Sequence, residues 1–284
     1  MSASRQIEPS LIAVTINLDN MSSQDPNYAD FFGIHSVAAA IIFAVAYVPL
    51  VGWFTIQSFG RPTYVFIILT LFCAIRIAGF IIRAILAASD SVGSNLGVLI
   101  AEQVLFGVGF FGLLYSAYTL VLDRWSLTAT APGNDPLSRI THNRRIFRIT
   151  LIIAVVLTTV GISVAMSNQH IGDALKVAGT LIFLVLTVSV AYQTVLLSGI
   201  ELRGNDYNSR AKINSLGQQY GAYILCMIAA LLIVREAFST VTVFDHAKQY
   251  NERLWYPLYA LPELLAVILY TTPGLVPPQS ELPA

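Results

Sequence analysis

Apolar residues in this chain gather into seven long blocks that are separated by short polar segments. The blocks lie near residues 34–56, 63–87, 95–122, 148–166, 177–199, 217–243 and 255–272. A bilayer-spanning helix needs about 17–25 apolar residues, and a longer block can tilt. The separating segments, such as "SFGRP" (58–62) and "TATAPGNDP" (128–136), carry the residues that end helices. Between the fourth and fifth blocks, "SNQHIGDALK" (167–176) predicts a short polar hairpin. The pattern predicts an all-α bundle of seven transmembrane helices over 34–273, with a polar head (1–33) and a short tail (274–284).

The composition agrees with a membrane protein. Hydrophobic residues make up 56% of the 284 residues and charged residues only 11%, against about 25% charged in ordinary soluble domains. Sixteen basic and sixteen acidic residues balance, so no basic surface indicates nucleic acid as a partner. We expect a multi-pass protein of the plasma membrane or an endomembrane, with membrane lipids as partners.

The distribution of Lys and Arg between the loops predicts the orientation. Nine lie in the loops after the first, third and fifth blocks, and four lie on the opposite side. Basic residues favour the cytoplasmic side, which places the N-terminus outside and the C-terminus in the cytoplasm. The sequon Asn20-Met21-Ser22 in the head is compatible with an extracytoplasmic location.

Six charged residues lie inside the apolar blocks: Arg76, Arg83, Glu102, Arg235, Glu236 and Glu263. Each unpaired charge near the bilayer centre costs about 2.5–3.5 kcal/mol, so six would cost about 15 kcal/mol. They must therefore pair or line a wet cavity. Five of them fall in the outer half of the membrane and Arg76 lies near its middle.

The depths of these residues favour the pairs Arg83–Glu102 and Arg235–Glu263. Arg235 and Glu236 are neighbours, about 100° apart around a helix, and we expect them to point in different directions. Gln103 joins the six as a candidate cavity-lining residue.

Three interpretations of these charges stay open: they hold the helices together, they line a ligand or translocation cavity, or they form a catalytic site. The fourth and fifth blocks carry no interior charge, which indicates a lipid-facing flank. Pro262 precedes Glu263 and removes one helical hydrogen bond, which frees the carbonyl of Leu258 beside the charges. Such a break can build a binding site or be a simple kink.

Other motifs have simpler explanations. "GVGFFG" (107–112) matches a nucleotide-binding pattern but lies inside an apolar block, where small residues let helices approach. Asp123-Arg124-Trp125 is similar to a receptor signature and more simply marks a helix end with an Arg reaching to water. Trp255 and Tyr256 are typical of an interfacial aromatic girdle. We expect no metal site, no cofactor and no enzymatic activity.

The segment "AYVPLVGWFTIQSFGRPTYVFIILTLFCAIRIAGFIIRA" (46–84), the Gly-rich third block and "IVREAFST" in the sixth block resemble a fungal family of seven-span membrane proteins of unknown function. That family is distantly similar to the RTA-like lipid-translocating exporters. The resemblance implies a seven-span topology and a lipid-like substrate.

Two functions follow from the charges and the resemblance. The first is binding or translocation of a small amphipathic or lipid-like molecule in a polar cavity of the outer half. The second is a seven-span receptor or sensor that signals through the cytoplasmic loops between spans 3 and 4 and between spans 5 and 6.

Overall fold

The computed structural model describes residues 29, 33–60, 62–127, 143–165, 168–208, 217, 220–243 and 251–277, with only the backbone of 201–208. Every regular element in these ranges is a helix, which confirms the all-α class. The Asn20 sequon and most of the expected polar head lie outside the described residues, as do several of the loop Lys and Arg residues used to predict the orientation.

The helices follow the apolar blocks closely. They are α3 (Val37–Gly60), α4 (Tyr64–Ala88), α5 (Asp90–Gly93), α6 (Leu96–Leu127), α8 (Arg144–Val164), α9 (Gln169–Asn208), α11 (Gly221–Thr242), α13 (Glu252–Trp255), the π-helical turn η1 (Tyr256–Ala260) and α14 (Leu261–Tyr270). In the described part of the chain, six of them (α3, α4, α6, α8, α9 and α11) are long and apolar enough to cross a membrane. Such a set of helices is that of a multi-pass membrane protein.

The last apolar block forms one helical stretch in three parts. α13, η1 and α14 follow one another without a gap from Glu252 to Tyr270. In the widened turn, the backbone N–H of Leu261 donates to the carbonyl of Tyr256, five residues back. Pro262 lies directly after this turn, and its ring nitrogen cannot donate a helical hydrogen bond. The backbone break that the sequence predicts is therefore a π-turn, a feature often found at functional sites.

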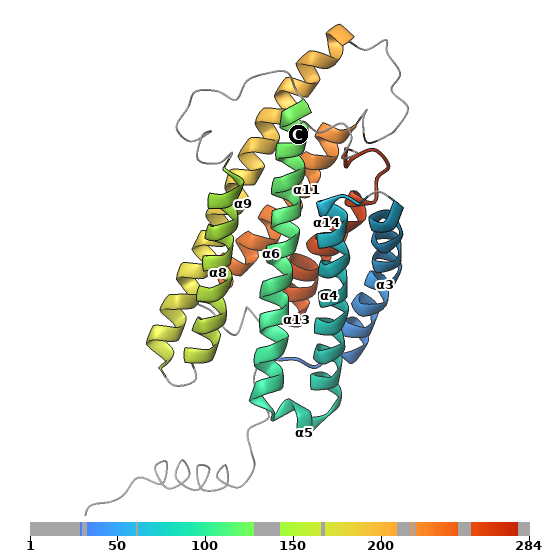
Figure 1. Cartoon of the computed structure of the whole chain (residues 1–284). Helices are drawn as coiled ribbons and strands as arrows, with labels where there is room; N and C mark the ends of the chain where they lie inside the picture. Colours follow the sequence, from blue (N-terminus) through green and yellow to red (C-terminus); the bar gives the residue numbers. More distant parts are fainter. Residues whose placement is uncertain are drawn as a thin grey trace, which may run out of the picture.

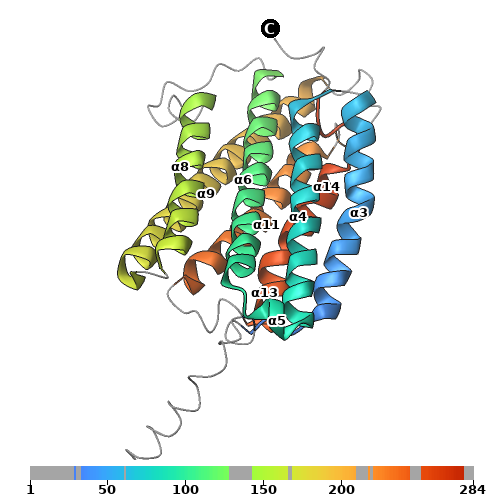
Figure 2. The same ribbon diagram turned by 60° about the horizontal axis from the view of Figure 1, so that its bottom comes forward.

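The long helices form a ring. α3, α4, α6, α8, α9, α11 and α14 each contact the next, and α14 returns to contact α3. Figures 1 and 2 show α3, α4, α6 and α8 side by side in one row, with α9, α11 and α14 in a second row behind it. α6 also contacts α9 and α11 across the ring, so it lies near the centre. Large apolar side chains such as Ile42 and Val45 of α3 stay exposed, as expected for a surface that faces lipid.

The turn between α8 and α9 differs from the prediction. The sequence predicts a polar hairpin over "SNQHIGDALK" (167–176), but α9 already begins at Gln169, so that Lys176 belongs to the helix. Glycines allow the close packing of this pair. A Cβ on Gly172 would lie 2.3 Å from the Cα of Ala165, and a Cβ on Gly179 would lie 2.9 Å from the carbonyl oxygen of Ala154. The two backbones touch because these positions carry no side chain.

The end of α6 also differs from the prediction. Arg124 does not reach to water: it is 8% exposed, and its Nη2 donates to the carbonyl of Gly217 at 2.9 Å. The N–H of Gly217 donates to the carbonyl of Pro273 at 3.0 Å. Asp123 accepts from Arg144 at 2.6 Å. These contacts join α6 to α8, to residue 217 and to the segment that follows α14.

Candidate functional site

The structure brings all six interior charges into the core of the ring. Arg76 and Arg83 come from α4, Glu102 from α6, Arg235 and Glu236 from α11 and Glu263 from α14, and each is at most 5% exposed. We refer to these six residues as the charge cluster. None of them faces lipid, because exposure of a charge to lipid would be costly.

One part of the cluster is the pair Arg83–Glu102, which the sequence predicts. Arg83 Nη1 donates to Glu102 Oε1 at 2.7 Å. The guanidinium lies over the ring of Trp255, with Cζ 3.9 Å from the ring centroid, in a favourable cation–π arrangement. Glu252 lies 4.0 Å from Arg83 Nη2. The Glu252 carboxylate also accepts the backbone N–H of Ser36 at 2.9 Å, just before α3 begins.

The other part of the cluster is built around Glu263. Its Oε1 accepts from Arg76 Nη2 at 2.7 Å and from Arg235 Nε at 3.0 Å. The Arg235–Glu263 pair is the predicted one, whereas Arg76–Glu263 is an additional pair that the sequence did not indicate. One carboxylate therefore joins α4, α11 and α14.

The expectation that Arg235 and Glu236 point in different directions is wrong. Arg235 Nη1 lies 2.5 Å from Glu236 Oε2, and Nη2 donates to the hydroxyl of Tyr259 in the π-turn. The Cα–Cβ bonds diverge around the helix, but the long Arg side chain bends back and bridges the angle. Phe110 and Tyr259 cover the guanidinium, with ring centroids 3.7 and 4.2 Å from Cζ.

The Gly-rich part of α6 has a specific role at Arg76. Arg76 Nη1 donates to the carbonyl of Phe106 at 3.0 Å. A Cβ on Gly109 would lie 2.8 Å from the same Nη1, so a larger residue would displace the guanidinium. Part of the small-residue pattern in "GVGFFG" thus makes room for a buried charge between α4 and α6.

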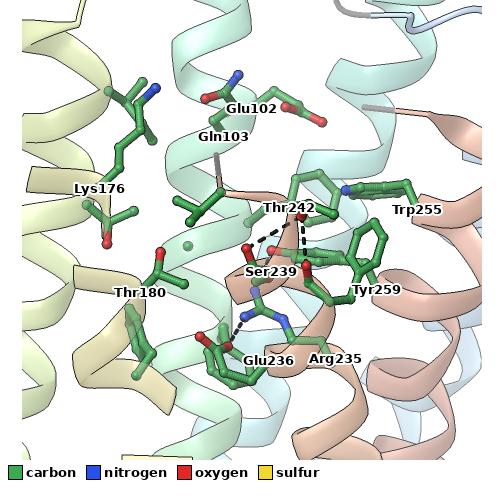
Figure 3. Close-up of a pocket in the computed structure, with 18 of the residues that line it drawn as sticks. Glu102, Gln103, Lys176, Thr180, Arg235, Glu236, Ser239, Thr242, Trp255 and Tyr259 are labelled. Carbon is green, nitrogen blue, oxygen red and sulfur yellow. Dashed lines mark hydrogen bonds and ion pairs between the residues drawn. The ribbon is translucent and has the colours of Figure 1, made fainter. Parts of the chain in front are cut away.

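A cavity of about 120 Å³ lies beside the cluster, between α6, α8, α9, α11 and η1. The predicted residues Arg83, Glu102, Gln103, Arg235 and Glu236 line it, together with aromatic side chains that include Phe106, Phe110, Phe183 and Tyr259. Figure 3 shows Lys176 and Thr180 on one side of this cavity and Trp255 and Tyr259 on the other. We call it the charge pocket. Arg76 and Glu263 are not among its lining residues, but each contacts one: Arg76 donates to the carbonyl of Phe106, and Glu263 accepts from Arg235.

α8 and α9 are not only a lipid-facing flank, contrary to the sequence-based expectation. Thr158 of α8 and Lys176, Thr180 and Phe183 of α9 line the charge pocket. Lys176 Nζ lies 3.3 Å from Asp173 Oδ1. The sequence gives a partial signal for this wall, because Lys176, Thr180 and Phe183 recur at helical spacing. The sequence predicts a turn over 167–176, which leaves Lys176 outside the helix, so this helical spacing is not apparent from the sequence alone.

The aromatic residues at the start of the last helical stretch are buried. Trp255 and Tyr256 are 6% and 8% exposed and do not form the interfacial girdle that the sequence indicates. Trp255 stacks on Tyr259 at 5.0 Å between ring centroids and meets Phe106 edge to face at 5.2 Å. Trp255 lies over the guanidinium of Arg83 and Tyr259 over that of Arg235, so these rings cover both parts of the cluster with apolar surface.

Comparison with known proteins gives a family. The model of a family described as "Domain of unknown function (DUF7702)" matches residues 33–277. No curated protein and no solved structure matches the chain. The matched range contains every helix described above and the whole charge cluster, and the chain belongs to this family of proteins with a domain of unknown function.

Proposed function

We propose that this protein binds a small amphipathic, lipid-like molecule by its polar head in the charge pocket and moves it across the membrane. The observation that carries the proposal is the lining of the pocket, which combines buried ion pairs with aromatic walls. Ligand sites typically pair apolar surface with a few fixed polar groups. The family that the sequence resembles is itself distantly similar to lipid-translocating exporters, which is why a lipid-like ligand is chosen for this proposal. We expect binding and transport without catalysis.

The size of the pocket supports recognition of a head group. About 120 Å³ is somewhat less than the roughly 150 Å³ of a protein cavity that holds one benzene molecule. A whole lipid is much larger than this. In our proposal the polar head enters the pocket and the apolar tail stays outside it.

The charges of the lining favour an acidic head. The described lining residues carry three basic side chains, Arg83, Lys176 and Arg235, and two acidic ones, Glu102 and Glu236. Both arginines are held by carboxylates at 3.0 Å or less. Lys176 is 19% exposed and its partner Asp173 is 33% exposed, and such exposed pairs are weak. Lys176 can therefore exchange Asp173 for an acidic ligand.

The lysine gives the first test of this proposal. In Lys176→Gln, affinity for a fluorescent fatty acid should fall by about ten- to a hundredfold, because a charge-assisted hydrogen bond contributes about 1.5–3 kcal/mol. The measurement is fluorescence titration of the purified protein, with a fatty amine of the same chain length as the comparison ligand. Arg253→Gln is the matched control, since Arg253 is an exposed residue of α13 outside the pocket lining. Equal affinity of the parent protein for the fatty acid and the fatty amine would contradict the proposal that the pocket recognises an acidic head group.

A second variant tests the pocket by filling it. Gly107 lines the pocket, and a Cβ there would have no atom within 4 Å. In Gly107→Val the added methyl groups should occupy the space of the ligand without disturbing the fold. Native mass spectrometry should then show loss of a co-purified amphipathic molecule that the parent protein retains. If Gly107→Val retained the molecule fully, the ligand would have to bind outside the charge pocket.

The proposal includes seven spans, with the N-terminus outside and the C-terminus in the cytoplasm. The nineteen-residue stretch from Glu252 to Tyr270 supports a seventh span, because its length suits a bilayer crossing. The membrane is the plasma membrane or an endomembrane. Single cysteines introduced at residues 2 and 283 test the orientation with an impermeant maleimide. In the plasma membrane only the first should react in intact cells, and in an endomembrane only the second should react once the plasma membrane alone is permeabilised.

A receptor is the second candidate function. The contacts of Arg124 with Gly217, and of Gly217 with Pro273, favour it. They join three segments at the end of the bundle away from the charge pocket, where a shift of helices would alter a cytoplasmic surface. Deletion of residues 128–142 separates the two candidates, because it should abolish signalling by a receptor and spare transport.

A further inference from the structure

A second cavity lies at the opposite end of the bundle from the charge pocket, where α3 ends, α4 begins and α14 ends. Its volume is about 260 Å³. The chain turns there at Gly274, whose φ of 81° suits glycine. After the turn, Leu275 and Val276 pack back onto the bundle and are 0% and 7% exposed. The described chain thus folds over this end and closes one side of the cavity.

The wall of this cavity is aromatic and uncharged. Trp53, Phe66 and Tyr270 supply three rings, and Gln57, Thr271 and Thr272 supply polar groups. No charged side chain is present among the described residues that line it. Aromatic side chains with polar neighbours are typical of the depth at which lipid head groups meet the acyl chains.

Several of these groups can bind a ligand hydroxyl. Tyr270 is 1% exposed, and its hydroxyl has no hydrogen-bond partner among the described residues. A buried hydroxyl is rarely left without a partner. Thr271 and Thr272 donate to the carbonyls of Ile268 and Leu269, so their oxygens can still accept a hydrogen bond.

We infer that this cavity binds the hydroxyl end of an uncharged membrane lipid, in which a sterol and a diacylglycerol share the required chemistry. A phosphate head would be buried there without a cation from the described lining, which is unfavourable. In this proposal the ligand hydroxyl bonds to the Gln57 carboxamide, the two Thr oxygens and the Tyr270 hydroxyl. The apolar body of the lipid lies against the aromatic rings of the cavity wall. Trp53 is 43% exposed, which keeps the site within reach of the surrounding bilayer.

Photolabelling of the whole chain tests the inference. The protein is reconstituted in phosphatidylcholine vesicles that contain a photoactivatable sterol, diacylglycerol or phosphatidic acid, and labelled peptides are identified by mass spectrometry. The sterol or the diacylglycerol should label peptides around Trp53 or Tyr270, and phosphatidic acid should not. Tyr270→Phe should lower this labelling by about two- to tenfold, the loss expected for one hydrogen bond. Gln57→Phe should abolish it by filling the cavity.

Tyr64→Phe is the matched control, because Tyr64 begins α4 at the same end of the bundle and is 52% exposed. It removes a tyrosine hydroxyl outside the described cavity lining and should leave labelling unchanged. Phosphatidic acid as the preferred label, or labelling that survives Gln57→Phe, would overturn the inference. Labelling unchanged by Tyr270→Phe would exclude the hydroxyl recognition on which it rests.

Discussion

Replacing Glu263 by leucine is expected to destabilise the protein by about 3–5 kcal/mol, because the substitution leaves Arg76 and Arg235 buried without this carboxylate. Glu263 lies within 3.0 Å of both guanidiniums, which are 0% and 5% exposed. A loss of this size is a large fraction of the about 5–15 kcal/mol of a typical protein. The measurement is thermal unfolding in detergent, together with the yield of monodisperse protein.

A double variant and a control separate the ion pair from a general effect of substitution. Arg76→Met combined with Glu263→Leu should recover more than half of the loss, since a buried pair replaced by apolar residues is often tolerated, and Arg235 keeps Glu236 and Tyr259. Asp173→Leu removes an acid from a partly exposed pair and should change stability by less than about 1 kcal/mol. If the double variant were no more stable than Glu263→Leu alone, the unpaired Arg76 would not be the cause of the lost stability.

Gly179→Val is expected to separate α8 from α9 and to lower both stability and ligand binding. A Cβ at Gly179 would lie 2.3 Å from Thr158 Oγ1 and 3.0 Å from the backbone nitrogen of Thr158. The hydroxyl can rotate, but the backbone of α8 must move, and overpacking of this kind costs about 1–3 kcal/mol. For a protein of this size we expect the melting temperature to fall by about 2–10 °C. Binding should weaken because Thr158 and Thr180 line the charge pocket.

The same helix offers a matched control for Gly179. A Cβ at Gly199 would have no atom within 4 Å, so Gly199→Val adds the same side chain where there is space. Its melting temperature should stay at or slightly above that of the parent, because glycine is the poorer helix former. Equal melting temperatures for the two variants would show that α8 and α9 do not need their close contact.

Reading the chain alone gives the class and most of the helix positions. The apolar blocks predict an all-α membrane protein, and the helices α3, α4, α6 and α11 begin and end within about five residues of the predicted limits. The predicted start of α9, at residue 177, is eight residues later than the observed start at Gln169, because "SNQHIGDALK" is polar. Polar residues normally indicate a loop, but close glycine packing allows the helix to begin within this segment, at Gln169.

The six interior charges must be satisfied inside the protein, and this requirement can be derived from the sequence because the cost of a charge in lipid depends on composition and depth. They are Arg76, Arg83, Glu102, Arg235, Glu236 and Glu263. Two of the pairs can also be predicted, since depth along a helix limits which charges can meet. The remaining partners and the wall that faces the cluster follow only from the folded arrangement of the helices. These depend on how helices rotate about their axes and how long side chains bend, and both are settled by packing between segments far apart in the chain.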